Sequence, residues 1–263
     1  MQLLISYGVR PGSQAEQVGR LILAVFVVLA LPALPFGTYL SYPFVILATW
    51  FHEMGHGLTA LVLGQDFQRL QIFADGSGVA ESMVAADLSP FSRAAIAAGG
   101  PLAPCLAGSL LILASAHQRL WRPALWALAA VIFASVILYV RSAAGFFVLP
   151  LVGIAIALIG WRASDYMTRF TLQFLGMLGA LSMLRDFNYL FTEEAVVGGQ
   201  RMLSDTGQIE AALFLPHWVW AAIILAICAA CVGASLKYAL AENRQGGSVR
   251  KRPANVAQFK RKR

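Results

Sequence analysis

The apolar residues of this chain gather in long runs that charged residues seldom interrupt. A helix that crosses the roughly 30 Å hydrocarbon layer of a bilayer needs about 20 mostly apolar residues. Runs close to that length lie at residues 21–39, 42–63, 94–116, 123–140, 142–161, 170–190 and 216–240. The pattern predicts an all-α polytopic membrane protein with about six or seven transmembrane helices.

A different pattern follows the second run. Residues 69–73 and 79–83 fit two short strands, and the sequence Asp75-Gly76-Ser77-Gly78 between them is typical of a turn. We therefore expect a short β-hairpin directly after the second helix. It is the one departure from helix that the pattern predicts.

The connections between the runs are too short for a separate soluble domain, and the chain contains no internal repeat. Residues 1–242 are therefore predicted to form a single transmembrane domain. Residues 243–263 are rich in Lys and Arg, and we expect a disordered cytoplasmic tail that lies against anionic lipid. This tail contains one aromatic residue, Phe259, and no recognisable binding fold, so nucleic acid is not an expected partner.

Composition supports a membrane protein. Hydrophobic residues make up 59% of the chain and charged residues 13%, about half the charge of an average soluble domain. The first run begins only after Arg20 and leads straight into the next, which favours a retained helix over a cleaved signal peptide. The cysteines 105, 228 and 231 all fall inside apolar runs, where we expect them to behave as small apolar residues.

Three ionisable residues interrupt the second run. His52, Glu53 and His56 lie in apolar sequence, where an ionisable side chain is costly unless it has a partner. Residues four apart share one face of a helix, so His52 and His56 can direct imidazole nitrogens to one metal ion. Zinc held by two imidazoles and a third protein ligand keeps a position for water, from which Glu53 can take a proton. The HExxH pattern therefore predicts a catalytic Zn²⁺ site.

The third ligand must come from another part of the chain. Asp186 lies near the end of the run 170–190, where a carboxylate is costly unless it meets a cation, and it is the predicted ligand. Asp205 is the alternative, although Asp205 and Gln208 have the spacing of a capping box that opens a short helix. Glu81 is a weaker candidate because it lies in the predicted hairpin.

Other histidine enzymes do not fit the sequence. A metzincin would place a third histidine six residues after His56, where the chain has Val62. His117 and His217 stand at the ends of apolar runs and are expected at the membrane interface. Four histidines in total are also too few for a membrane di-iron enzyme, which uses several histidine boxes.

The chain resembles the site-2 protease family of intramembrane zinc metallopeptidases, especially its compact, divergent M50B-like branch. The residues that carry the resemblance are FHEMGH at 51–56, the hairpin that follows, and Gly99-Gly100-Pro101 at the start of the third run. The resemblance implies that the hairpin is associated with the membrane and that its edge holds an extended substrate. It also implies zinc as the cofactor.

The predicted function is hydrolysis of peptide bonds in membrane-embedded or membrane-proximal proteins or peptides. Glu53 would be the catalytic base, and His52, His56 and Asp186 would bind Zn²⁺. The alternative is a non-catalytic membrane scaffold or carrier with a structural or vestigial metal site. We expect a multi-pass protein of a bacterial inner membrane from its short loops and compact size. The sequence sets neither the substrate nor the oligomeric state.

Overall fold

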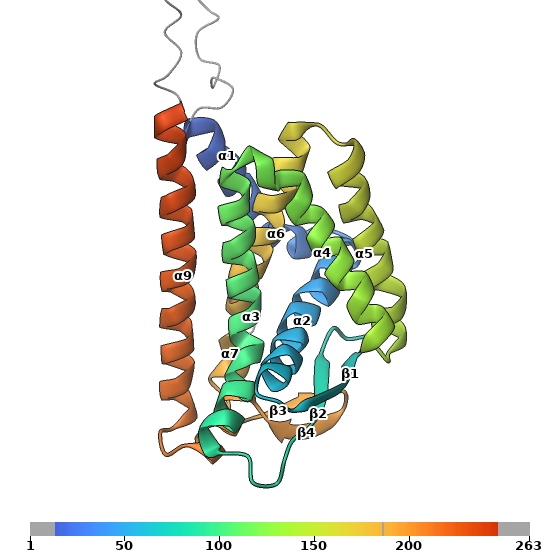
Figure 1. Cartoon of the computed structure of the whole chain (residues 1–263), viewed down its shortest axis with the longest axis vertical. Helices are drawn as coiled ribbons and strands as arrows, with labels where there is room; N and C mark the ends of the chain where they lie inside the picture. Colours follow the sequence, from blue (N-terminus) through green and yellow to red (C-terminus); the bar gives the residue numbers. More distant parts are fainter. Residues whose placement is uncertain (1–13, 186, 247–263) are drawn as a thin grey trace, which may run out of the picture.

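The chain folds into a helix bundle that carries two short β-hairpins at one end (Figure 1). The computed structural model describes residues 14–185 and 187–246. The helices are α1 (Gln14–Ala30), α2 (Gly37–Val62), α3 (Pro90–Ala116), α4 (Trp121–Leu138), α5 (Ala143–Arg162), α6 (Asp165–Arg185), α7 (Phe187–Leu190), α8 (Asp205–Ala212) and α9 (His217–Gly246), with 3-10 turns η1 (Leu31–Ala33) and η2 (Gln118–Leu120). The strands are β1 (Asp66–Ile72), β2 (Gly78–Met83), β3 (Glu194–Val197) and β4 (Gln200–Leu203). The predicted class, mainly helical with a hairpin after the HExxH helix, is confirmed.

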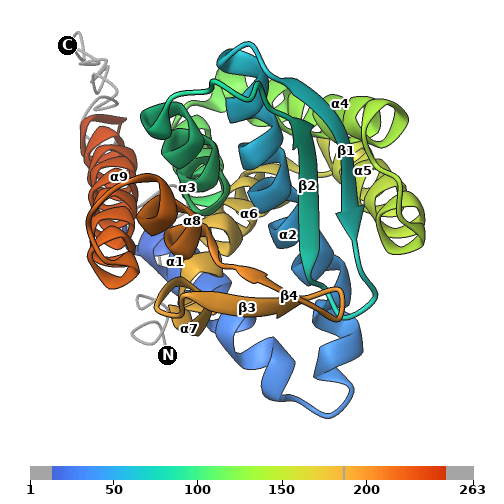
Figure 2. The same cartoon turned by 90° about the horizontal axis from the view of Figure 1, so that it is seen from below.

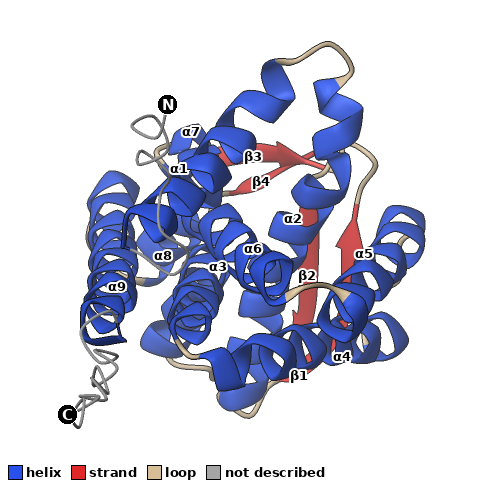
Figure 3. Ribbon diagram, turned by 90° about the horizontal axis from the view of Figure 1, so that it is seen from above, coloured by secondary structure: helices blue, strands red, loops and turns tan. Residues whose placement is uncertain are grey.

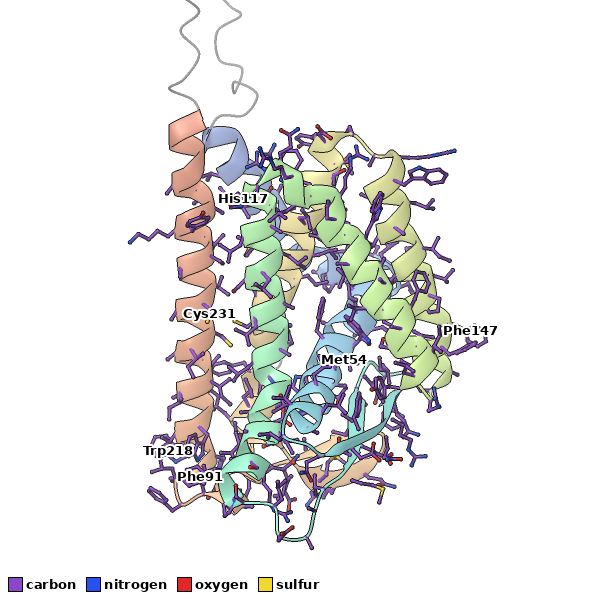
Figure 4. All side chains as sticks on the ribbon, viewed as in Figure 1. Met54, Phe91, His117, Phe147, Trp218 and Cys231 are labelled. Atoms are coloured by element: carbon purple, nitrogen blue, oxygen red, sulfur yellow. The ribbon has the colours of Figure 1, made fainter. Side chains whose placement is uncertain are left out.

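Within the described residues, four helical segments are long and apolar enough to cross a membrane. They are α3, α4 with the turn before it, α5, and α9 as far as Ala241. A shorter apolar segment, Val18–Ala33, covers most of α1 and the turn after it. Large apolar side chains cover their outer faces, as Phe147 and Leu151 of α5 do, and Figure 4 shows Phe147 pointing away from the bundle. Such faces suit contact with lipid tails. The total number of spans stays a prediction.

The expected first span, residues 21–39, is not one helix. The α1 helix ends at Ala30, the 3-10 turn follows, and α2 begins at Gly37. Pro32 lies at the start of that turn, and Phe36 adopts a left-handed conformation with φ of 60°. The left-handed conformation of Phe36 turns the chain out of a helical path, and Pro32 cannot donate a backbone hydrogen bond that would continue α1. The apolar run 21–39 therefore covers the end of α1, the 3-10 turn and the start of α2.

Helices α2, α3 and α6 form the centre of the bundle, as the view in Figure 3 shows. The α2 residues Ile46, Leu47 and Trp50 are fully or almost fully buried, and the Trp50 indole donates to the Ser135 hydroxyl at 2.8 Å. On its other side α2 approaches α3 so closely that a methyl group at Gly55 would collide with the backbone of α3. Small residues allow this approach, which brings α3 against the HExxH motif.

The first hairpin lies alongside α2 (Figure 2). Its antiparallel register runs from Asp66 opposite Met83 to Ile72 opposite Gly78. The outer edge of β1 is covered, because the Leu70 backbone exchanges hydrogen bonds of 2.9 Å with the segment between α4 and α5. Strand β2 therefore has its other edge turned towards α2.

A second hairpin, β3–β4, was not predicted. Its two strands have four residues each, and Gly198 and Gly199 make the turn with φ of 56° and 82°. The Gly198 N–H lies 3.4 Å from the Ser77 hydroxyl in the turn of the first hairpin. The two hairpins thus meet tip to tip beside α2.

Candidate metal centre

Two histidines of α2 face the same point. His52 and His56 are one helical turn apart, and their ring centroids lie 5.0 Å from each other. Their imidazoles rest on Gly100 of α3, where an added methyl group would lie 2.7 Å from His52 Nε2 and closer still to His56 Nε2. Glycine at this position therefore makes the space in which both rings sit.

A hydrogen bond determines which nitrogen of His56 faces the site. His56 Nδ1 lies 2.8 Å from the carbonyl oxygen of Ile96. A carbonyl only accepts, so Nδ1 carries the proton of the neutral ring and Nε2 presents a lone pair. An outer hydrogen bond of this kind is typical of metal-binding histidines.

The carboxylate that meets the two histidines belongs to Asp205, the first residue of α8. Its oxygens lie 2.9 Å from His52 Nε2 and 3.2 Å from His56 Nε2. The Asp205 side chain is only 3% exposed, against 13% and 14% for the histidines. The structure thus assembles the predicted alternative ligand, whereas Asp186 lies outside the described residues.

The local structure of α8 explains why Asp205 is available. Ser204 caps the helix, since its hydroxyl accepts from the Gly207 N–H at 3.0 Å and donates to the Thr192 carbonyl at 2.5 Å. Thr206 donates to the Leu190 carbonyl at 2.8 Å. The expected capping box of Asp205 with Gln208 was wrong. Because Ser204 provides the cap, the Asp205 carboxylate is free to point at the histidines.

The three donors fit a zinc ion. Within the part of the chain that the structure describes, His52, His56 and Asp205 form a group whose ligand atoms all lie within 4.8 Å of one another. Bonds of about 2.1 Å to a tetrahedral zinc would set neighbouring ligand atoms about 3.4 Å apart, close to the observed spacing. The His56 lone pair and the Asp205 carboxylate both accept, and a buried pair of acceptors needs a cation or a proton between them. Two imidazoles and one carboxylate leave a fourth position open.

Glu53 lies beside this cluster and against the first hairpin. An added methyl group at Gly78 would lie 2.9 Å from Glu53 Oε1, and the Ala80 backbone interacts favourably with the Glu53 carboxylate. Ala80 pairs with Leu70, whose own backbone groups turn the other way, so the Ala80 N–H is free to face α2. The edge of β2 therefore holds the Glu53 side chain in place.

A cavity of about 270 Å³ opens beside the cluster, between the tips of the two hairpins. Its lining comes from α2, the β1–β2 turn, α7 and β3, and consists of Thr49, His52, Glu53, Asp75, Gly76, Ser77, Gly78, Tyr189, Val196 and Val197. The side-chain and backbone hydrogen bonds from Ser77 lower the pKa of Asp75, so this carboxylate stays charged. Among the described residues, the side chains that line the cavity include two carboxylates and no lysine or arginine.

The other residues considered from the sequence lie elsewhere. Glu81 pairs with Arg69 at 2.8 Å on the hairpin. The His117 ring stacks on Tyr238, and His217 contacts Glu210 at 2.7 Å. None of these side chains belongs to the metal-binding group of the described residues.

Three contributors to the site were not predicted from the sequence. Tyr189 lines the cavity, Ser204 frees Asp205, and Gly100 seats both histidines. Ser is a common N-cap residue, so the position of Ser204 directly before Asp205 could have indicated its capping role. Tyr189 gave no signal, because only the fold brings α7 to α2.

This arrangement, a buried cluster of two histidines and a carboxylate inside a bundle of apolar helices, is that of a membrane metallopeptidase. A family model described as Peptidase M50B-like matches residues 20–235, which is well over half of the chain. The chain belongs to this Peptidase M50B-like family, and the predicted resemblance to the site-2 proteases is confirmed. It is accordingly an integral membrane protein. No curated protein and no solved structure matches it.

Proposed function

We propose that this protein is an intramembrane zinc endopeptidase in which His52, His56 and Asp205 bind the metal. The observation that carries the proposal is the meeting of Asp205 with both histidines, directly beside Glu53 and an open cavity. Structural zinc sites are usually closed by four protein ligands, mostly cysteine. The three donors here favour catalysis over the predicted alternative of a scaffold or carrier.

Zinc bound at these residues would lower the pKa of a water molecule and polarise the substrate carbonyl. Glu53 is placed to accept the proton of that water. The water oxygen then forms a bond to the carbonyl carbon while the π-electron pair of the carbonyl moves to its oxygen. When the pair returns and the C–N bond breaks, Glu53 passes its proton to the leaving amine.

The substrate is a membrane-embedded or membrane-proximal polypeptide in an extended form. A peptide bond inside a helix is shielded by neighbouring turns, so an extended segment is the form that the cavity can accept. The cavity walls come from α2, the hairpin turn, α7 and β3, and a space of about 270 Å³ between them has room for a few side chains and not for a folded domain. A bacterial inner membrane remains the expected location.

The Glu53→Gln variant tests the proposal. The unaltered protein and the variant are reconstituted in liposomes with a pooled library of single-span reporter helices, and products are identified by mass spectrometry. We expect zinc-dependent cleavage by the unaltered protein and a loss of at least about 1,000-fold in the variant, which should still bind zinc. Glu81→Gln is the matched control, since Glu81 pairs with Arg69 away from the cavity.

Cleavage by Glu53→Gln at the unaltered rate would refute the assignment of the base. A fully zinc-loaded, unaltered protein that cleaves no member of the library would instead support the non-catalytic alternative.

A further inference from the structure

The cavity beside the cluster has few groups that could bind an oxygen carrying negative charge. Among the described residues that line it, the side chains with an O–H are Thr49, Ser77 and Tyr189. The Thr49 hydroxyl donates to the Gly76 carbonyl at 2.6 Å, and the Ser77 hydroxyl donates to Asp75 Oδ1 at 2.7 Å. Both protons thus stabilise the turn of the first hairpin, which leaves Tyr189 as the candidate donor.

Tyr189 lies against the metal-binding side chains. Its ring meets the His52 ring edge to face, with 6.4 Å between centroids and an interplanar angle of 73°. Electrostatic interactions also couple the Tyr189 hydroxyl to the carboxylate and the backbone of Asp205. The phenol is therefore within reach of the atoms around which the reaction would take place.

The Tyr189 hydroxyl faces the cavity lining and can offer its proton to an acceptor there. That proton turns by rotation about the C–O bond. A donor that needs only one bond rotation costs little reorganisation when charge appears nearby.

We infer that Tyr189 is a catalytic residue, whose O–H donates a hydrogen bond to the substrate carbonyl oxygen as it becomes negative. The inference rests on the proposed function and deepens it. During the attack of water, the electron pair of the C=O bond moves to this oxygen, and the phenol O–H turns towards it. Tyr189 keeps its proton throughout, so no bond to hydrogen is broken at this residue.

The Tyr189→Phe variant removes the hydroxyl and keeps the ring that packs on His52. Tyr139→Phe is the matched control, because the Tyr139 ring stacks on Phe67 with 4.3 Å between centroids, outside the cavity. Zinc affinity is measured by competition with a chromogenic chelator, and kcat and KM are measured on a peptide cleaved by the unaltered protein. We expect Tyr189→Phe to lower kcat by about 100- to 1,000-fold, with KM and zinc affinity within about threefold of the unaltered values. The control should change neither.

Two results would overturn the inference while leaving the proposed function intact. An unchanged kcat in Tyr189→Phe would show that the phenol donates nothing to the reaction. A loss of zinc affinity as large as the loss of activity would show that Tyr189 only positions Asp205. Failure of the proposed function is distinguishable from both, because the unaltered protein itself would then show no zinc-dependent cleavage.

Discussion

Substitution of Gly100 by alanine puts a methyl group where the two histidine rings now sit. That methyl would lie 2.7 Å from His52 Nε2 and still closer to His56 Nε2. Carbon contacts are comfortable at about 3.5 Å or more, so His52 would have to move by about 0.8 Å and His56 by more than about 1 Å. Metal–ligand distances tolerate only about 0.2 Å. The site therefore cannot hold zinc and the methyl group together without a shift of α3.

We expect Gly100→Ala to weaken zinc binding at least about 100-fold, which corresponds to about 2.8 kcal/mol. The assay is competition with a chromogenic chelator on detergent-purified protein. Gly233→Ala serves as a neutral control, because an added methyl group there has nothing within 4 Å. Gly108→Ala is a packing control, since its methyl would lie 2.5 Å from the Gly176 carbonyl of α6 and away from the histidines.

Zinc affinity in Gly100→Ala equal to that of the unaltered protein would refute the reasoning. A weakening of the same size in folded Gly108→Ala would also refute it, because general strain in α3 would then explain the effect without a contact at the histidines.

Three further predictions follow from the same geometry. Ser204→Ala removes the cap of α8 and should cost about 1–2 kcal/mol of stability and weaken zinc binding, measured by thermal unfolding and chelator competition; unchanged values would contradict the role of the cap. Asp75→Asn removes a charge from the cavity and should raise cleavage of substrates with acidic residues next to the scissile bond about two- to fivefold relative to neutral ones, and an unchanged ratio would contradict the proposed charge effect. Removal of zinc by a chelator should lower the unfolding temperature, since zinc at about 100 times its Kd stabilises the folded state by about 2.7 kcal/mol; an equal loss in a His56→Ala variant would show that the stabilising metal binds elsewhere.

Much of the fold could be predicted because hydrophobic periodicity and length determine where a helix can cross a bilayer. This signal predicted the HExxH helix and the long apolar helices, and turn residues predicted the hairpin with its Asp75–Gly78 turn. The site residues His52, Glu53 and His56 could be identified because an ionisable side chain in an apolar helix is costly unless it has a partner. These signals are local, so a single sequence contains them.

The third ligand was harder because it depends on a contact between distant segments. Asp205 is 149 positions beyond His56, and its spacing from Gln208 suggested a cap. The structure assigns that cap to Ser204 instead. The β3–β4 hairpin escaped prediction for a related reason, since strands of four residues show too little alternation to stand out.

The zinc content of the purified protein, measured by elemental analysis beside identically handled Asp205→Ala and Asp186→Ala variants, tests the central claim most directly. The account predicts about one zinc per chain in the unaltered protein and in Asp186→Ala, and almost none in Asp205→Ala. Zinc retained in Asp205→Ala and lost in Asp186→Ala, or an unaltered protein that takes up no zinc when it is supplied, would contradict the account.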